Sequence, residues 1–107
     1  MNLLQFLECC SKEITLNFGI TGKIICGESN SSKEVVWLKN GEMIGKTFKT
    51  FIYSRYLHIS CLESSDSGEY VCKDDVTSSN YIDSYRLTVR NPGMHTIPNY
   101  CVIVYAR

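Results

Sequence analysis

The chain has 107 residues, of which 44% are apolar, and eleven basic residues balance eleven acidic ones. This length allows one domain of ordinary size and excludes two separate hydrophobic cores. A net charge of zero provides no overall field for a polyanion or an anionic membrane, so we expect a partner other than nucleic acid. No run of the chain approaches the roughly 20 apolar residues of a membrane-spanning helix.

Residues 1–11 form an N-terminal segment that we interpret as a signal remnant or a linker. The segment is apolar between Leu3 and Leu7, but no basic residue precedes this stretch. Glu8 interrupts it before it reaches the about 7–15 residues of a signal-peptide core, so a complete signal peptide is not predicted. A degraded signal, a piece of a longer chain and an intracellular domain with reduced cysteines all fit. We favour a fragment or truncated product.

Residues 12–90 alternate apolar and polar side chains between turn residues, which predicts β-strands, and no stretch has the period of a helix. The pair Asn40-Gly41 predicts a tight hairpin, because both positions of a type I′ turn need positive φ. This part of the chain is therefore expected to be all-β. The predicted strands are 13–17, 23–26, 34–39, 42–44, 56–59, 69–73 and 81–90, with 46–54 as an irregular edge segment.

Residues 91–107 have a different character and are interpreted as a linker or tail. Asn91-Pro92-Gly93 is a set of turn residues, and Pro98 is a second strand breaker. The apolar stretch 100–105 reads as a strand with no partner. It is either the start of a second domain or sequence with no fold of its own.

The chain has six cysteines, which is dense usage for this length and indicates disulfides made in an oxidising compartment. Six cysteines allow about fifteen pairings, and their number alone does not choose among them. The cysteines are Cys9, Cys10, Cys26, Cys61, Cys72 and Cys101.

Three features follow one another along the chain: Cys26, Trp37 and the run Leu57-x-Ile59-x-x-Leu62-x-x-x-Asp66-x-Gly68-x-Tyr70-x-Cys72. Together they resemble the signature of immunoglobulin domains of the I or V kind. The resemblance covers residues 12–90. It implies an immunoglobulin-like antiparallel β-sandwich in this range.

The resemblance also implies a role for each residue of the signature. A disulfide between Cys26 and Cys72 would join the two sheets, with Trp37 packed over it. The hydroxyl of Tyr70 would bond back to the backbone of the preceding corner, which Asp66 and Gly68 would shape. The remaining expected core residues are Leu57, Ile59 and Leu62.

Arg55 is a candidate for the charged partner of Asp66, and the alternative is a solvated arginine at a loop edge. Cys61 lies outside the alternation that faces the core, so we expect it to be exposed at the surface or paired to another segment. Cysteines of the two chain ends could form a staple, or remain as free or intermolecular thiols. Their pairing is left open.

Motifs for catalysis are absent from the sequence. It has no glycine-rich phosphate loop, no nucleophile elbow and no Cys-x-x-Cys pair. Of the two histidines, His58 alternates with apolar neighbours and is expected to face outward, whereas His95 lies in the tail. The Asp74-Asp75 pair is expected to be a solvated loop. We therefore predict neither an enzyme nor a cofactor or metal site.

A finer resemblance, to ectodomains of the interleukin-1 receptor family and the similar soluble poxviral decoy receptors, is carried by three stretches: 18–27, 36–41 and 57–72. It implies an extracellular or secreted module that binds a protein ligand of the cytokine class. A cysteine expected late in the domain of that family is missing between Tyr81 and Arg90. The alternatives are an adhesion or growth-factor-receptor domain, a structural module of an intracellular array, and a truncated product without function.

Two kinds of surface are candidates for ligand contact. One is formed by the loops 28–33 and 73–80, and the first of these holds the glycosylation sequon Asn30-Ser31-Ser32. The other is a sheet face that carries tyrosines, which are enriched at interfaces. The tyrosines considered are Tyr53, Tyr56, Tyr81 and Tyr85. The alternative, which we favour, is that these side chains pack within the domain.

Overall fold

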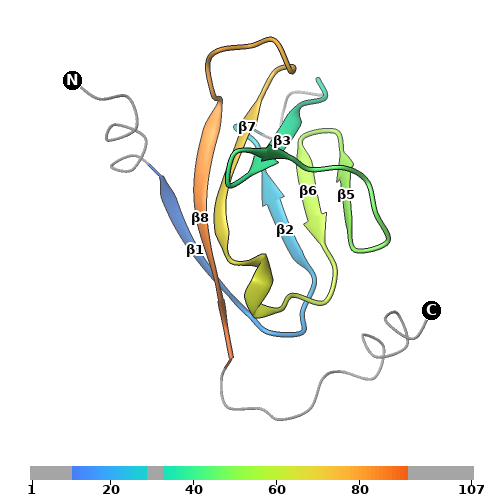
Figure 1. Cartoon of the computed structure of the whole chain (residues 1–107), viewed down its shortest axis with the longest axis vertical. Helices are drawn as coiled ribbons and strands as arrows, with labels where there is room; N and C mark the ends of the chain where they lie inside the picture. Colours follow the sequence, from blue (N-terminus) through green and yellow to red (C-terminus); the bar gives the residue numbers. More distant parts are fainter. Residues whose placement is uncertain (1–10, 29–32, 92–107) are drawn as a thin grey trace.

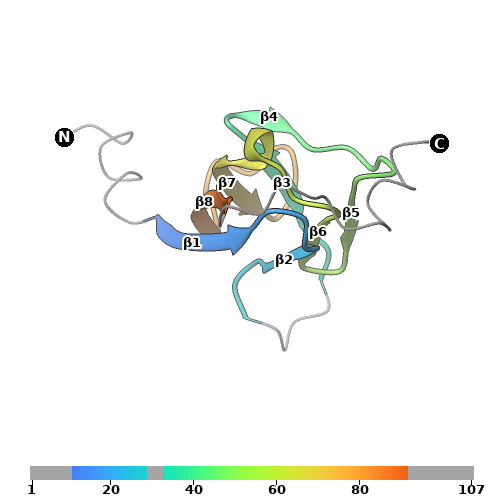
Figure 2. The ribbon, with the colours of Figure 1, turned by 90° about the horizontal axis from the view of Figure 1, so that it is seen from below.

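The computed structural model describes residues 11–28 and 33–91, which form two β-sheets packed face to face (Figure 1). One sheet has five strands in the order β1-β8-β7-β3-β4, and the other has three in the order β2-β6-β5. The view along the sandwich in Figure 2 separates the two layers. The predicted all-β sandwich is confirmed.

The elements follow the predicted alternation closely, with small shifts at their ends. They are β1 (Lys12–Asn17), β2 (Gly22–Ile25), β3 (Val36–Lys39), β4 (Glu42–Met43), β5 (Thr50–Tyr53), β6 (Tyr56–Ile59), the 3-10 helix η1 (Ser64–Asp66), β7 (Gly68–Lys73) and β8 (Asp83–Arg90).

Strand β1 is parallel to β8, from the pair Lys12 and Tyr85 to the pair Asn17 and Arg90. The other strand pairs of both sheets are antiparallel. At the end of β1 the chain crosses to the opposite sheet, and β2 runs back beside β6. The first strand and the second strand therefore belong to different layers.

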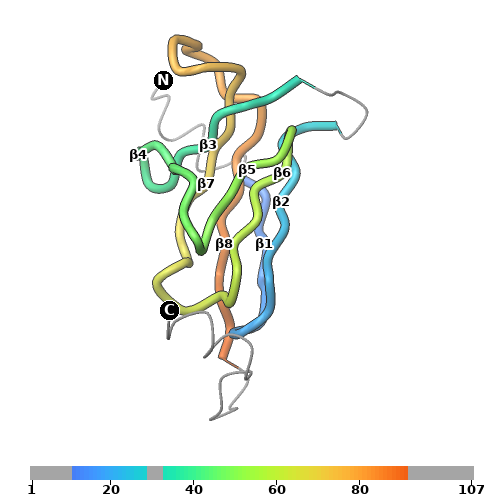
Figure 3. The backbone as a smooth tube through the Cα atoms, turned by 90° about the vertical axis from the view of Figure 1, so that its right-hand side faces the viewer, coloured from blue at the N-terminus to red at the C-terminus, as the bar shows by residue number. Residues whose placement is uncertain are grey.

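A hairpin turn and a segment of irregular sequence hold the edge strands β4 and β5. Asn40 and Gly41 have φ values of 49° and 88°, the positive pair that a type I′ hairpin between β3 and β4 requires. The segment 46–54, whose strand boundaries the sequence left open, contains β5 as an edge strand of the three-stranded sheet. Figure 3 shows β5, β6 and β2 side by side along the tube of the backbone.

The core lies between the sheets and is built from the alternate residues that point inward from each strand. It is closed at one end by Leu62, which follows β6. The buried cluster comprises Ile24, Cys26, Val35, Trp37, Leu57, Ile59, Leu62, Tyr70, Cys72, Tyr85, Leu87 and Val89.

No helix in the described ranges is long and apolar enough to cross a membrane. The partnerless strand predicted at 100–105, the N-terminal segment before residue 11 and the sequon at Asn30 lie outside the described residues.

Candidate functional site

The two sheets are joined by a disulfide between Cys26, directly after β2, and Cys72 in β7, with Cα atoms 6.1 Å apart. Trp37 is fully buried and is the register partner of Cys72 in the neighbouring strand β3. Its ring stacks on that of Tyr85 at 6.3 Å between centroids. The indole Nε1 has no hydrogen-bond partner among the described residues. This centre is a packed structural core rather than an accessible site.

Tyr85, one of the four tyrosines considered for a binding face, packs within the domain instead. It is buried, and its hydroxyl donates to the carbonyl of Ile25 at 2.7 Å, across the sandwich. Burial is the main reason that the pKa of Tyr85 is raised, and the charge of nearby Asp83 adds to it. Tyr85 therefore acts as a tie between the sheets.

The corner before β7 is closed by main-chain hydrogen bonds. The hydroxyl of Tyr70 donates to the carbonyl of Asp66 at 2.5 Å, and the carboxylate of Asp66 accepts from the backbone N–H of Glu63 at 2.9 Å. Burial, and then the charge of Asp66, raises the pKa of Tyr70 well above its usual range. Gly68 follows with φ of 155°, where a Cβ would meet the side chain of Asn40 at 3.0 Å. The corner thus depends on a glycine, an aspartate and a buried tyrosine.

The structure does not pair Asp66 with the candidate partner Arg55. Its carboxylate lies 3.1 Å from the ammonium of Lys49. Arg55 lies at the other end of β6, where its Nε donates to the carbonyl of Cys26 at 2.8 Å and its guanidinium to that of Lys33 at 3.2 Å. The arginine therefore supports the loop after β2 instead of the corner.

Cys61 is buried, with 4% of its surface exposed, which excludes the first of its two expected states, exposure at the surface. It is bonded in a disulfide, as the second expected state requires. Its backbone has a positive φ of 51°, and the ammonium of Lys49 donates to the carbonyls of Ser60 and Cys61 at 3.0 Å each. The same lysine therefore holds both the corner and this cysteine.

The outer face of the three-stranded sheet carries the main surface of interest, which we call the aromatic face. Its side chains form two rows across the sheet, because residues paired in register point to the same side. The rows follow from the pairing of β2 with β6 and of β6 with β5. The first row is Lys23, His58 and Phe51, and the second is Ile25, Tyr56 and Tyr53.

Contacts within the aromatic face hold its rings in place. Phe51 and His58 stack with ring centroids 4.4 Å apart and planes 5° from parallel. The ammonium of Lys23 lies 4.5 Å from the centre of the Tyr56 ring, a cation–π arrangement. Tyr53 is 70% exposed and Phe51 39% exposed, so apolar ring area faces solvent. The rings of Phe51, His58 and Tyr56 are therefore in contact with neighbours within the face.

Charge on the aromatic face is sparse. Lys23 is the one permanently charged residue of the two rows. Burial, and then the charge of Lys23, lowers the pKa of His58 below its ordinary value. Because a lowered pKa favours the neutral imidazole, the face is apolar and aromatic at neutral pH with a single positive edge.

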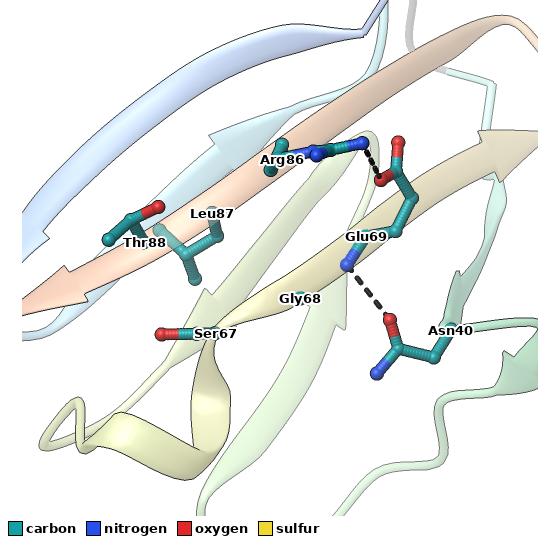
Figure 4. Close-up of a pocket in the computed structure, with 7 residues that line it drawn as sticks. All are labelled: Asn40, Ser67, Gly68, Glu69, Arg86, Leu87 and Thr88. Carbon is teal, nitrogen blue, oxygen red and sulfur yellow. Dashed lines mark hydrogen bonds and ion pairs between the residues drawn. The ribbon is translucent and has the colours of Figure 1, made fainter. Parts of the chain in front are cut away.

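The outer face of the five-stranded sheet has a pocket beside β7 and β8, but its polar groups already bond to one another. Arg86 and Glu69 form an ion pair at 3.2 Å, and the backbone N–H of Glu69 donates to the side chain of Asn40 at 2.9 Å (Figure 4). The other lining residues are Ser67, Gly68, Leu87 and Thr88. No buried polar atom is aimed into this pocket without a partner among the described residues, so it is a weaker candidate than the aromatic face.

The loop 73–80 is closed on itself. The ammonium of Lys73 donates to the carbonyl of Ser78 at 3.1 Å, and Asp75 accepts from both the backbone and the hydroxyl of Thr77. Those hydrogen bonds lower the pKa of Asp75. Asp74 forms an ion pair with Lys33 at 3.7 Å. No group of three or more potential metal ligands occurs within residues 11–28 and 33–91.

Sequence reasoning identified Tyr53 and Tyr56 as surface candidates but missed Lys23, Phe51 and the stacking role of His58. Phe51 lay in a segment without predicted strand boundaries, so its facing direction was open. The alternation of β6 places His58 outward, but only the register of β5 brings Phe51 directly opposite. The turn at Ser54-Arg55, where Ser54 has φ of 55°, sets that register, but Ser-Arg is not a typical pair for a two-residue hairpin turn, so the sequence carried no signal for it.

Several solved structures resemble this chain. Domains 1–4 of Sidekick-1 match with a TM-score of 0.66 and 20% identity, over 79% of this chain and 24% of theirs. An immunoglobulin-like domain from human cDNA matches with a TM-score of 0.63 and 21% identity, over 82% of this chain and 78% of its own. The CD2-binding domain of CD58 matches with a TM-score of 0.57 and 20% identity, over 74% of this chain and 53% of its own.

These matches show that the chain has an immunoglobulin-like fold, as the cysteine, tryptophan and corner residues predicted. The chain spans about half the length of the CD58 chain and about a quarter of the Sidekick-1 chain. No family model and no curated protein matches the sequence. The finer resemblance to cytokine receptors stays a prediction.

Proposed function

We propose that this chain is a protein-binding immunoglobulin-like module that contacts its ligand through the aromatic face. The observation that carries the proposal is the pair of rows across β2, β6 and β5, in which Tyr53 is 70% exposed and Phe51 and His58 are stacked. Aromatic side chains supply large contact areas with few rotatable bonds, and they are enriched among the residues that dominate binding energy.

A macromolecular ligand fits this surface better than a small molecule does. Sites for small molecules are concave and enclose most of the ligand, whereas the aromatic face lies on the outer side of a three-stranded sheet. Prior stacking of Phe51 on His58 reduces the entropy lost on binding. The matching surface would be apolar, with an acidic group opposite Lys23.

For its cellular context, we propose an extracellular module of a receptor or a secreted decoy receptor of the cytokine-binding class. The Cys26–Cys72 disulfide supports an oxidising compartment, and the disulfide state of Cys61 adds to that support. An adhesion or growth-factor-receptor domain is the alternative that shares this context. A structural module of an intracellular array would keep its cysteines reduced.

Binding to a panel of secreted ligands tests the proposal. The immobilised full chain is presented with interleukin-1-type cytokines, interferons and adhesion ectodomains, and affinity is measured by surface plasmon resonance. We expect Tyr53→Ser to lower the affinity for the bound ligand at least about tenfold, which corresponds to a loss of about 1.4 kcal/mol of binding free energy. Tyr81→Ser is the matched control, because Tyr81 is 42% exposed but lies outside the two rows.

The outcomes separate the parts of the proposal. A ligand whose affinity falls with Tyr81→Ser and not with Tyr53→Ser removes the aromatic face as the binding surface. Absence of binding by every interleukin-1-type ligand and interferon removes the cytokine version. The Cys26–Cys72 bridge and the disulfide of Cys61 use four of the six cysteines and leave two that can be free. Four or more free thiols, counted on native protein with a thiol reagent, would favour the intracellular alternative.

A further inference from the structure

Cys61 is disulfide-bonded, and its partner lies outside the described residues. The described part contains three cysteines, of which Cys26 and Cys72 bond to each other. Cys61 must therefore bond to one of the cysteines near the chain ends. Within this chain these are Cys9, Cys10 and Cys101.

The position of Cys61 is set by its neighbour Leu62, whose N–H donates to the carbonyl of Ile20 at 2.8 Å. Ile20 belongs to the turn between β1 and β2, so Cys61 lies at that end of the sandwich. Arg90, the last residue of β8, lies at the same end, because its carbonyl accepts from the N–H of Phe18 at 2.8 Å. Figure 1 shows this turn, η1 and the end of β8 together at one end of the sheets.

The N-terminal cysteines start from the opposite end. Ser11, which precedes β1, forms a hydrogen bond with Ser84 through their hydroxyl groups, at the end of the sandwich away from Cys61. Strand β1 separates the two ends by 6 residues, which is about 20 Å at about 3.3 Å per residue. Beyond Ser11, Cys10 extends at most about 4 Å and Cys9 about 7 Å. A disulfide adds at most about 7 Å between Cα atoms, which gives Cys9 a reach of about 14 Å. Neither cysteine reaches the end of the sandwich that holds Cys61.

Cys101 starts from the correct end. It follows Arg90 by about eleven residues, which span up to about 36 Å when extended, far more than the separation of neighbouring segments at one end of the sandwich. We propose that Cys61 and Cys101 form a second disulfide, which ties the segment after β8 to the β1–β2 turn and the corner. In its formation the two thiols lose two electrons and two protons to a disulfide donor such as oxidised glutathione, which is reduced to two thiols.

The surroundings of Cys61 make it a fixed attachment point. Lys49 donates to its carbonyl and to that of Ser60 at 3.0 Å each, and Leu62 is fully buried. Its backbone is thereby held on both sides. The two overlapping disulfides then enclose residues 26–101, past the end of β8, and a chain that stops at Arg90 leaves the Cys61 thiol without this partner.

Peptide mapping of the full chain tests the proposal without any variant. Protein from the monomer band of a non-reducing gel is alkylated with iodoacetamide without reductant and digested with trypsin and with a protease that cleaves after glutamate. The cleavage sites place the cysteines of interest on separate peptides: 9–12, 24–28, 56–63, 70–73 and 91–107. We expect 56–63 joined to 91–107, and 24–28 joined to 70–73.

Two variants sharpen the result. Cys101→Ser should make Cys61 fully alkylated, a gain of one thiol on peptide 56–63, whereas the matched control Cys10→Ser should leave 56–63 joined to 91–107. The proposal is overturned if wild-type 56–63 is alkylated, if it is joined to 9–12 or to a second copy of itself, or if its link to 91–107 occurs only in a dimer. It is also overturned if 56–63 stays protected in Cys101→Ser.

Discussion

Lys49 is predicted to stabilise the corner through several contacts at once. Its ammonium donates to the carbonyls of Ser60 and Cys61 at 3.0 Å each and lies 3.1 Å from the carboxylate of Asp66. Hydrogen bonds to charged groups contribute about 1.5–3 kcal/mol each, and the ordering of a long side chain offsets part of this. We expect Lys49→Met to lower the free energy of unfolding by about 2–3 kcal/mol.

A double-mutant cycle tests which cation is coupled to Asp66. Lys49→Met and Asp66→Asn should show an interaction energy of about 1 kcal/mol or more, because the two groups are in contact. Arg55→Met and Asp66→Asn should be additive within about 0.5 kcal/mol, because Arg55 bonds at the other end of β6. Urea unfolding is followed by the fluorescence of Trp37, which is the single tryptophan and is fully buried. Coupling of Arg55 and additivity of Lys49 would refute the assignment.

Three further predictions concern single residues. Tyr70→Phe removes the hydrogen bond to the carbonyl of Asp66 and should cost about 1–2 kcal/mol in urea unfolding, whereas an unchanged midpoint would show that this bond is dispensable. Gly68→Ala places a Cβ at φ of 155° and within 3.0 Å of a neighbouring side chain, so it should cost at least about 1 kcal/mol, and a neutral result would contradict the close approach. The pKa of His58 is lower in the folded state than its unfolded value of about 6.5, so its contribution to stability is fully present above that pH and is lost as the pH falls toward the folded pKa. NMR titration should place this pKa below that of an unfolded peptide and raise it in Lys23→Gln; a value at or above the peptide's would contradict the burial of the ring.

The core and the corner could be read from the sequence because their signals are local. Alternation with a period of two assigns Leu57 and Ile59 to the inside of a strand, wherever that strand is placed. The spacing of Asp66, Gly68 and Tyr70 encodes one turn within a few residues. Such features need little knowledge of distant parts of the chain.

The pairing of charges could not be predicted in the same way. Arg55 precedes Asp66 by 11 residues and Lys49 by 17, and either can neutralise a carboxylate. The direction of β6 decides between them, because it carries the chain from Arg55 at one end of the sandwich to Asp66 at the other. Lys49 reaches the corner from the turn before β5, which runs back antiparallel to β6.

The sequence by itself determined an all-β chain with its inward residues, its central cysteine and tryptophan set and its tyrosine corner, since these depend on side-chain alternation and short spacings. The tertiary structure alone decided that Lys49 holds the corner, that Tyr85 is buried, that Cys61 lies within the fold, and that Lys23, His58 and Phe51 form one row. Each of these depends on which strands are neighbours and in what register. A shift by one residue would turn a whole row to the other face, so the aromatic face exists only as a product of strand pairing.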